Sequence, residues 1–166
     1  MLPNKEQKGL IMGTIKLPHK SIKFFEKNYP VIFEQGALAE GKWNEESSKV
    51  VRKYVGVNHA IPVSSNGTGM AAMLQLMNHC FKRNHVLIQS NTMYGVQTMV
   101  NAAGSEIKGI IDCDTIFLVP TLEMIRTEVE KISSTNYGKL IVLLSHIGGI
   151  INPWMEEITK YCDDHI

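Results

Sequence analysis

The sequence predicts an α/β fold in which a doubly wound, mostly parallel sheet is covered by helices on both faces. Segments that are apolar throughout alternate with segments whose apolar residues recur at helical spacing. Such strands are buried on both sides, as in parallel sheets. Small or polar residues follow three of the strands, at the edge where ligands bind in this class. The chain ends directly after a helix, which predicts an incomplete, partial sheet.

Composition excludes several classes of protein. The chain has 166 residues and a net charge of +1, so it has the size of one domain and no general attraction to nucleic acid or acidic membranes. Its three cysteines are far apart, which favours a reducing compartment over a disulfide framework or a zinc site. No apolar run is long enough to span a bilayer, and the N-terminus has no apolar leader. We therefore expect a cytoplasmic protein.

Residues 1–40 are predicted to form an N-terminal arm that packs on a partner subunit. Proline and glycine interrupt this segment, and one short helix is expected over residues 21–29. Residues 41–166 are expected to form the folded domain. Its first helix is predicted to begin at Asn44 as N-cap and to end at Gly56.

A polar turn between residues 64 and 69 is the central candidate site. We expect a short strand over residues 60–64 before it and a helix from Thr68 to Phe81 after it. Gly67 leaves backbone N–H groups unobstructed, and nearby hydroxyls add to the positive end of the helix, which together favour an anion such as phosphate. The alternative is an ordinary helix start with Ser65 or Asn66 as N-cap.

The remaining chain repeats the strand–helix pattern. Three further strands are expected in this part of the chain, and with residues 60–64 they make a sheet of four strands. The last helix is predicted to open with Asn152 as N-cap and Pro153 at its first position. The other expected elements are strands over 85–89, 106–111 and 139–144 and helices over 92–103 and 122–132.

Five motifs, in order and at matching spacing, resemble the DegT/StrS-type sugar-nucleotide aminotransferases, a family of fold type I. The resemblance covers residues 41–166 and implies the N-terminal portion of a large domain like that of the pyridoxal-phosphate-dependent transferases. The motifs are Gly41-Lys42-Trp43 with the following helix, Ser65-Asn66-Gly67-Thr68, Gln89-Ser90-Asn91-Thr92, Asp112-Cys113-Asp114, and Ser145-His146-Ile147-Gly148-Gly149.

The resemblance implies pyridoxal 5′-phosphate as cofactor. Asn66, Gly67 and Thr68 would hold its phosphate, and Met93 or Tyr94 would lie against its ring. His146 would lie near the cofactor or the subunit boundary; its alternative role is structural, with a bond to the loop backbone. The complete enzyme would move an amino group from a donor such as glutamate to a nucleotide-linked keto-sugar, in polysaccharide or deoxyamino-sugar biosynthesis. It would act as a homodimer.

The departures from the family limit that expectation. Met93 stands where the family places an aromatic residue, and Gln89 stands where proline is common. The chain ends before the expected positions of the Schiff-base lysine and of the acid that pairs with the pyridine nitrogen, and neither Lys139 nor Lys160 matches that lysine. No catalytic residue is therefore assigned, and the chain alone is expected not to catalyse transamination.

Two other readings remain open. The chain could be a non-catalytic α/β module that binds a phosphate-bearing ligand or a partner. A Rossmann-like nucleotide site is weaker, because the turn lacks the glycine spacing of that motif. Asp112 and Asp114 are expected in turns and caps rather than at a metal. The histidines expected to be solvated are His59, His79 and His85.

Overall fold

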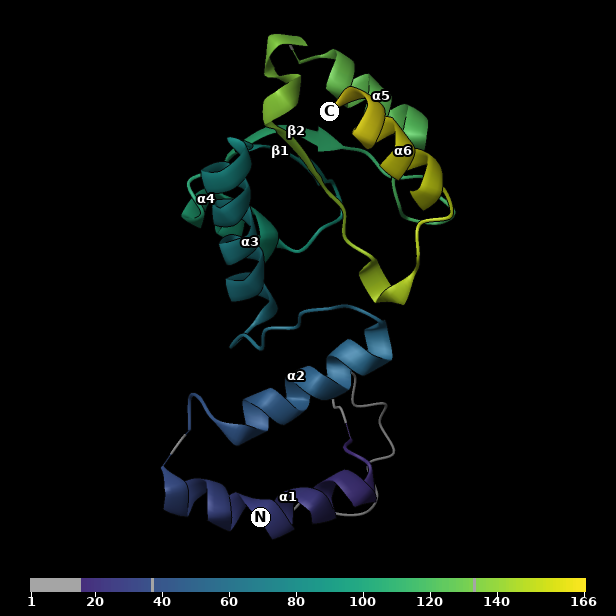
Figure 1. The fold of residues 1–166 in the computed structure, drawn as a ribbon. Helices are drawn as coiled ribbons and strands as arrows, with labels where there is room; N and C mark the ends of the chain where they lie inside the picture. Colours follow the sequence, from purple (N-terminus) through teal and green to yellow (C-terminus); the bar gives the residue numbers. More distant parts are fainter. Residues whose placement is uncertain (1–15, 37, 133) are drawn as a thin grey trace. The chain divides into compact units, whose positions relative to one another are not determined.

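The computed structural model describes residues 16–36, 38–132 and 134–166. The chain divides into two compact units, and the boundary falls between Pro62 and Val63. The first unit contains α1 (His19–Gln35) and α2 (Lys42–Val55), and the second contains the sheet and the other helices (Figure 1). Residues 1–15 of the predicted arm lie outside the described residues.

Helix α1 is longer than the helix predicted over residues 21–29 and continues through Pro30. A proline in a helix interior removes one hydrogen bond and normally ends the helix. Here aromatic contacts one turn apart lie on both sides of it: the ring centroids of Phe25 and Tyr29 are 5.5 Å apart, and those of Tyr29 and Phe33 are 5.9 Å apart. Such contacts stabilise adjacent helical turns.

Helix α2 begins at Lys42, earlier than the predicted N-cap Asn44. The Asn44 amide instead donates a hydrogen bond of 2.7 Å to the carbonyl of Ala39, in the segment that leads into the helix. The helix ends as predicted at Gly56, whose φ of 79° is in the left-handed region.

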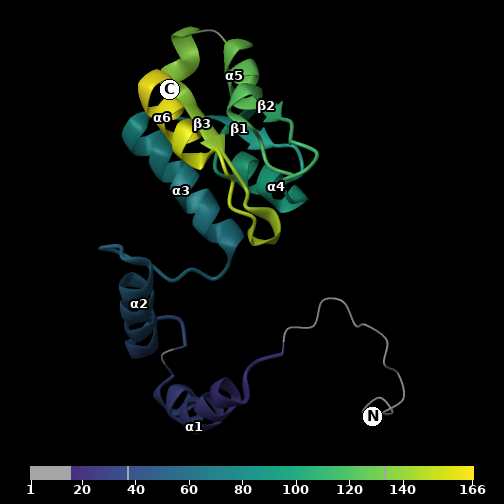
Figure 2. The same ribbon diagram turned by 90° about the vertical axis from the view of Figure 1, so that its right-hand side faces the viewer.

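The sheet contains β1 (His85–Gln89), β2 (Glu106–Ile111) and β3 (Leu140–Leu143) in the order β2-β1-β3. Both pairings are parallel, as predicted. Figure 2 shows β1 between β3 and β2. The bounds of the first two strands are those expected, while β3 is one residue shorter at each end than the predicted 139–144. Because β1 is central, its last residue lies beside the ends of both neighbours.

Helices cover both faces of the sheet, which confirms the predicted α/β layers (Figure 1). On one face, Val86 and Ile88 of β1 pack with Leu74 of α3 (Asn66–Phe81) and Val100 of α4 (Tyr94–Ala102). On the other face, Leu87 packs with buried residues of α5 (Leu122–Glu130) and α6 (Met155–His165). Successive side chains of a strand point to opposite faces, so a fully apolar strand contributes to two cores.

The strand predicted over residues 60–64 is not formed. Within the described chain these residues have no regular structure, and Ile61 and Val63 are 83% and 50% exposed. Pro62 has no N–H group to donate to a sheet. The described sheet therefore has three strands rather than four.

Candidate ligand-binding site at the carboxyl edge of the sheet

The start of α3 carries a cluster of three hydroxyl groups. Ser65 is the N-cap, and its Oγ accepts a 3.1 Å hydrogen bond from the N–H of Thr68, which confirms the predicted cap. The Oγ1 of Thr68 lies 3.0 Å from the Oγ of Ser65 and 3.2 Å from the Oγ of Ser64. All three residues are exposed, so Thr68 is the centre of a hydroxyl cluster open to solvent.

The same helix start leaves donors for an anion. The N–H of Thr68 is satisfied by the cap, whereas Asn66 and Gly67 occupy first-turn positions whose N–H groups have no acceptor inside a helix. No acidic residue lies in the first turn. A Cβ at Gly67 would be 3.3 Å from Cγ and Sδ of Met99, so this glycine lets the α3 start approach α4 closely.

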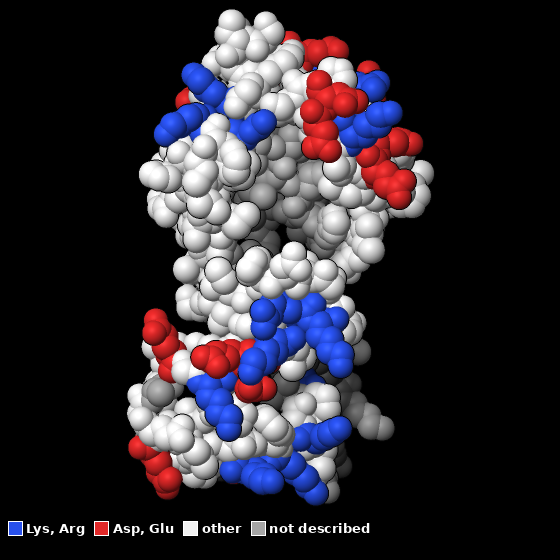
Figure 3. Space-filling model, in the orientation of Figure 1, with Lys and Arg blue, Asp and Glu red and all other residues white. Residues whose placement is uncertain are grey.

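Most of the sequence around this edge carries no charge, and the exception is the loop after β2, which contains Asp112 and Asp114. Residues 60–78, 84–105 and 140–155 contain no Asp, Glu, Lys or Arg. On the face shown in Figure 3, charged side chains of this unit gather over α5 and α6 and, on the other side, near the C-terminal end of α3, and the surface between these two groups is free of them. Attraction for an anion at this edge therefore rests on N–H groups, hydroxyls and the helix dipole.

Two large side chains are exposed where α4 begins. Met93 is the N-cap residue of α4 and is 74% exposed, and Tyr94 is its first residue and is 81% exposed. The helix begins two residues later than predicted, because residues 90–93 form the turn that leads out of β1. Both side chains are thus available to a ligand at the carboxyl edge.

A buried polar network joins the turn after β1 to the segment after β3. Gln89 is only 1% exposed, and its Oε1 accepts a 3.2 Å hydrogen bond from the N–H of Ser145. Its Nε2 donates to Oδ1 of Asn91. The hydroxyls of Thr92 and Ser145 are 2.6 Å apart. The expected convergence of these two strand ends is therefore confirmed.

Two asparagines connect the loop after β2 to the same edge. Nδ2 of Asn91 donates to the carbonyl of Leu118 at 2.8 Å. Asn152, which is 2% exposed, donates from Nδ2 to the carbonyl of Pro120 at 2.7 Å and accepts from the N–H of Trp154 at 2.9 Å. Side-chain amides thus join all three loops.

The predicted start of the last helix is wrong. Helix α6 begins at Met155 with Trp154 as N-cap residue, so Asn152 is not the N-cap and Pro153 is not the first helical residue. The Asn152 amide closes a local turn and binds another loop, which a cap side chain facing its own helix could not do.

His146 follows β3 and immediately precedes a short 3₁₀ helix, Ile147–Gly149. Its side chain is exposed and makes no capping hydrogen bond to that helix. Gly148 and Gly149 have φ values of 67° and 77°, which suit glycine and make the tight turn possible. The imidazole therefore lies at the ligand-facing edge of the sheet, beside the Ser145 that Gln89 holds.

Asp114 stabilises a turn, as predicted. Its Oδ1 accepts hydrogen bonds from the N–H groups of Ile116 and Phe117 at 2.8 and 2.9 Å, and these bonds lower the pKa of the carboxyl group. Asp112 accepts from the neighbouring N–H of Cys113 at 2.8 Å. Across the part of the chain that the structure describes, no group of three or more His, Cys, Asp or Glu side chains could hold a metal ion.

The histidines expected to be solvated differ in their exposure. His59 and His79 are exposed as predicted, but His85 is partly buried at the start of β1. Its Nδ1 has no hydrogen-bond partner among the described residues, and burial, followed by repulsion from Lys108 and Lys139, lowers its pKa. Lys139 precedes β3 and therefore lies at the amino edge, opposite the candidate site.

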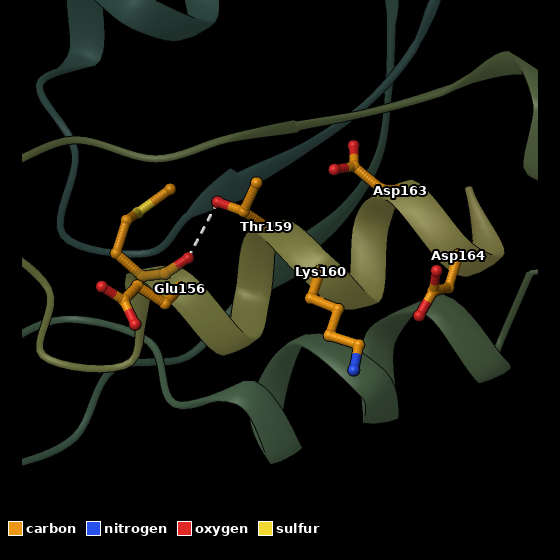
Figure 4. A pocket seen from close by; sticks show the side chains of 6 residues that line it. Glu156, Thr159, Lys160, Asp163 and Asp164 are labelled. Carbon is orange, nitrogen blue, oxygen red and sulfur yellow. Dashed lines mark hydrogen bonds between the residues drawn. The ribbon is translucent and has the colours of Figure 1, made fainter.

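A hollow on the outer surface of α6 is a poorer candidate. It is lined by residues of that helix alone, and Figure 4 shows Glu156, Lys160 and Asp164 reaching into open space rather than toward a common point. The hydrogen bond drawn there, from Thr159 to the carbonyl of Met155, is internal to the helix. Nothing in this arrangement selects a ligand.

The buried amides of Gln89 and Asn152 were not identified as site residues from the sequence. A glutamine at the end of an apolar strand is a detectable signal, because a buried amide requires hydrogen-bond partners. The partners themselves, Ser145 and the carbonyl of Pro120, lie 56 and 32 residues away in the chain. Their identity could not be read from local sequence.

Parallel strands covered on both faces, with an uncharged polar helix start and loops joined at the carboxyl edge, define the class of protein. They form a partial α/β fold like that of the pyridoxal-phosphate-dependent transferases. The profile of the DegT/DnrJ/EryC1/StrS aminotransferase family matches residues 21–166, and the chain belongs to this family.

Two further findings complete the comparison. A search among curated proteins found no significant match to the chain. Among the described residues, no helix has both the length and the apolar character needed to cross a membrane.

Proposed function

We propose that the carboxyl edge of this sheet binds pyridoxal 5′-phosphate as part of an aminotransferase. The observation that carries the proposal is the exposed hydroxyl cluster of Ser64, Ser65 and Thr68 at the start of α3. Together with the N–H groups of Asn66 and Gly67, it presents neutral donors at the positive end of a helix. That arrangement suits a phosphate group.

The residues around the cluster are compatible with the ring of the cofactor. Met93 and Tyr94 expose large side chains at the start of α4, and His146 exposes its imidazole after β3. A thioether or a phenol can cover the face of an aromatic ring. In the proposal, the α3 start holds the phosphate, Met93 or Tyr94 contacts the ring, and His146 lies near it.

The cofactor, when bound, supplies the electron sink that amino-group transfer requires. The residues assigned here bind and orient it, and none is assigned a catalytic proton transfer. The proposed substrates are an amino donor such as glutamate and a nucleotide-linked keto-sugar, as the resemblance of the sequence motifs implies. Residues 41–166 would belong to the large, cofactor-binding domain, and residues 1–40 to an arm.

A homodimer is proposed as the working form. Within the N-terminal unit, α1 buries none of its residues. Phe25, Tyr29 and Phe33 recur at four-residue spacing on one side of α1 and are 59%, 41% and 63% exposed. An aromatic stripe of this kind marks a surface for protein contacts. Sedimentation of the wild type and of Phe25→Lys tests this: the wild type should be dimeric and the variant should shift toward monomer.

The test of cofactor binding uses pyridoxamine 5′-phosphate, which has an amine in place of the aldehyde and cannot condense with surface lysines. Fluorescence titration of the full chain should show saturable binding of this compound. Pyridoxamine, which lacks the phosphate, should bind at least about tenfold more weakly, and inorganic phosphate should compete. Equal affinity for the two pyridoxamines would show that the α3 start does not bind the phosphate and would refute the proposal.

A further inference from the structure

We propose that Gln89 is a positioning residue that aligns the ring-contacting loops of the cofactor site. The inference rests on the proposed function and adds a residue to it. Gln89 is the last residue of the central strand, and its side chain is almost fully buried. From this place it reaches the loop after its own strand and the segment after β3.

The hydrogen bonds form a directional chain, which we call the amide relay. The N–H of Ser145 donates to Oε1 of Gln89, Nε2 of Gln89 donates to Oδ1 of Asn91, and Nδ2 of Asn91 donates to the carbonyl of Leu118. The relay begins at a backbone N–H, which can only donate, and ends at a backbone carbonyl, which can only accept. The orientation of both side-chain amides is therefore determined.

The relay connects the loops after all three strands. Ser145 lies after β3, Asn91 after β1 and Leu118 after β2. The hydroxyl contact of 2.6 Å between Thr92 and Ser145 closes the connection between the first two loops. Thr92 directly precedes Met93 and Ser145 directly precedes His146, so the relay holds the residues next to two proposed ring contacts.

No smaller or apolar side chain could replace Gln89. An apolar residue would leave the N–H of Ser145, which lies in a partly buried segment, without its acceptor, and an unpaired polar group removed from water is costly. The amide of Asn91 is exposed and could turn to water, so it would lose the orientation that Gln89 gives it. A carboxylate could still accept from Ser145 but would place an acceptor against Oδ1 of Asn91. Gln89 therefore supplies both the reach and the donor–acceptor order that the relay requires.

The first experiment compares Gln89→Leu with Gln75→Leu, the same substitution at an exposed position of α3. In Gln89→Leu we expect the affinity for pyridoxamine 5′-phosphate to fall by about tenfold, since one oriented loop contact is lost. Hydrogen exchange of the Ser145 amide should accelerate by at least about tenfold. Gln75→Leu should change neither quantity.

The second experiment uses Gln89→Glu, which keeps the shape of the side chain and replaces the donating Nε2 by a carboxylate oxygen that can only accept. When protonated, the introduced carboxyl group can donate to Asn91 again, so its pKa should be raised in the folded state. The melting temperature of Gln89→Glu should lie below that of the wild type at about pH 8 and approach it near pH 5. Asp112, Asp114 and His146 are the other ionisable side chains of these loops, and the same pH series on the wild type is the control for them.

The outcomes separate the relay from the proposed function. Unchanged exchange of the Ser145 amide in Gln89→Leu, or a pH-independent difference for Gln89→Glu, would show that the relay does not hold the loops. Faster exchange with undiminished cofactor affinity would overturn the positioning role. If the wild type binds no pyridoxamine 5′-phosphate, the proposed function fails, while exchange and the pH series still decide whether the relay exists.

Discussion

Replacing Thr68 by valine separates the proposed ligand contact from the helix cap. Valine has nearly the shape of threonine, and the backbone N–H of residue 68 can still donate to Oγ of Ser65 at the present 3.1 Å. What is lost is the Oγ1 that lies within 3.2 Å of two serine hydroxyls. Because Thr68 is exposed, we expect Thr68→Val to change the free energy of unfolding by no more than about 0.5 kcal/mol.

The effect on binding should be larger than the effect on folding. A hydrogen bond to a charged phosphate contributes about 2 kcal/mol, which corresponds to roughly a 30-fold loss of affinity for pyridoxamine 5′-phosphate. Ser65→Ala is the matched comparison, because it removes the cap and should cost about 1 kcal/mol of stability as well. Fluorescence titration and urea unfolding measure the two quantities on the same samples.

One result would refute this reasoning. If Thr68→Val binds the cofactor analogue as tightly as the wild type, the hydroxyl at the centre of the cluster does not contact the phosphate. If the wild type also binds pyridoxamine and pyridoxamine 5′-phosphate equally well, the turn serves only to start α3.

Three further predictions concern stability. Asn152→Ala leaves the buried Pro120 carbonyl without its donor and should lower the free energy of unfolding by about 2 kcal/mol in urea, whereas Asn101→Ala, on the exposed side of α4, should have little effect. Gly109→Ala would bring a Cβ to 2.9 Å from Cδ2 of Leu87, and we expect the free energy of unfolding to fall by about 1–3 kcal/mol. An unfolding midpoint in urea equal to that of the wild type would show that this contact is not tight. Burial lowers the pKa of His85 in the folded state, so the unfolded chain binds more protons once the pH falls below about 6.5 and stability should decline there. His85→Gln should remove that decline while His79→Gln leaves it, and identical pH profiles for the wild type and His85→Gln would show that His85 does not cause it.

The local pattern of the sequence was sufficient for most elements of the second unit. Apolar-rich segments identified β1 and β2 at their observed bounds. The sequence placed the cap before the apolar helix at Ser65 or Asn66, and the structure selects Ser65, with the helix starting two residues before the expected Thr68. These features depend on neighbours in the chain: alternation, capping and turn chemistry act over a few residues. The identification of Asp114 as a turn residue succeeded for the same reason.

Several of the errors have a common cause, which is that the deciding contact is distant in sequence. Residues 60–64 have apolar, strand-like composition, yet a strand forms only where a partner offers hydrogen bonds, and none does so here within the described chain. Asn152 looks like a cap, but its amide binds the carbonyl of Pro120. His85 was expected to be solvated at the edge of a strand, and tertiary packing partly buries it at the start of β1.

The sequence by itself determined the α/β class, the order of the three strands that form and of the helices between them, and the hydroxyl-rich start of α3. It did so because hydrophobic periodicity and caps are local properties. Only the tertiary structure decided that Gln89, Asn91 and Ser145 form a single relay, because residues far apart in the chain meet only when parallel strands align their carboxyl ends. The phosphate-type turn is thus visible in the sequence, whereas the alignment of the loops beside it follows from the folded sheet.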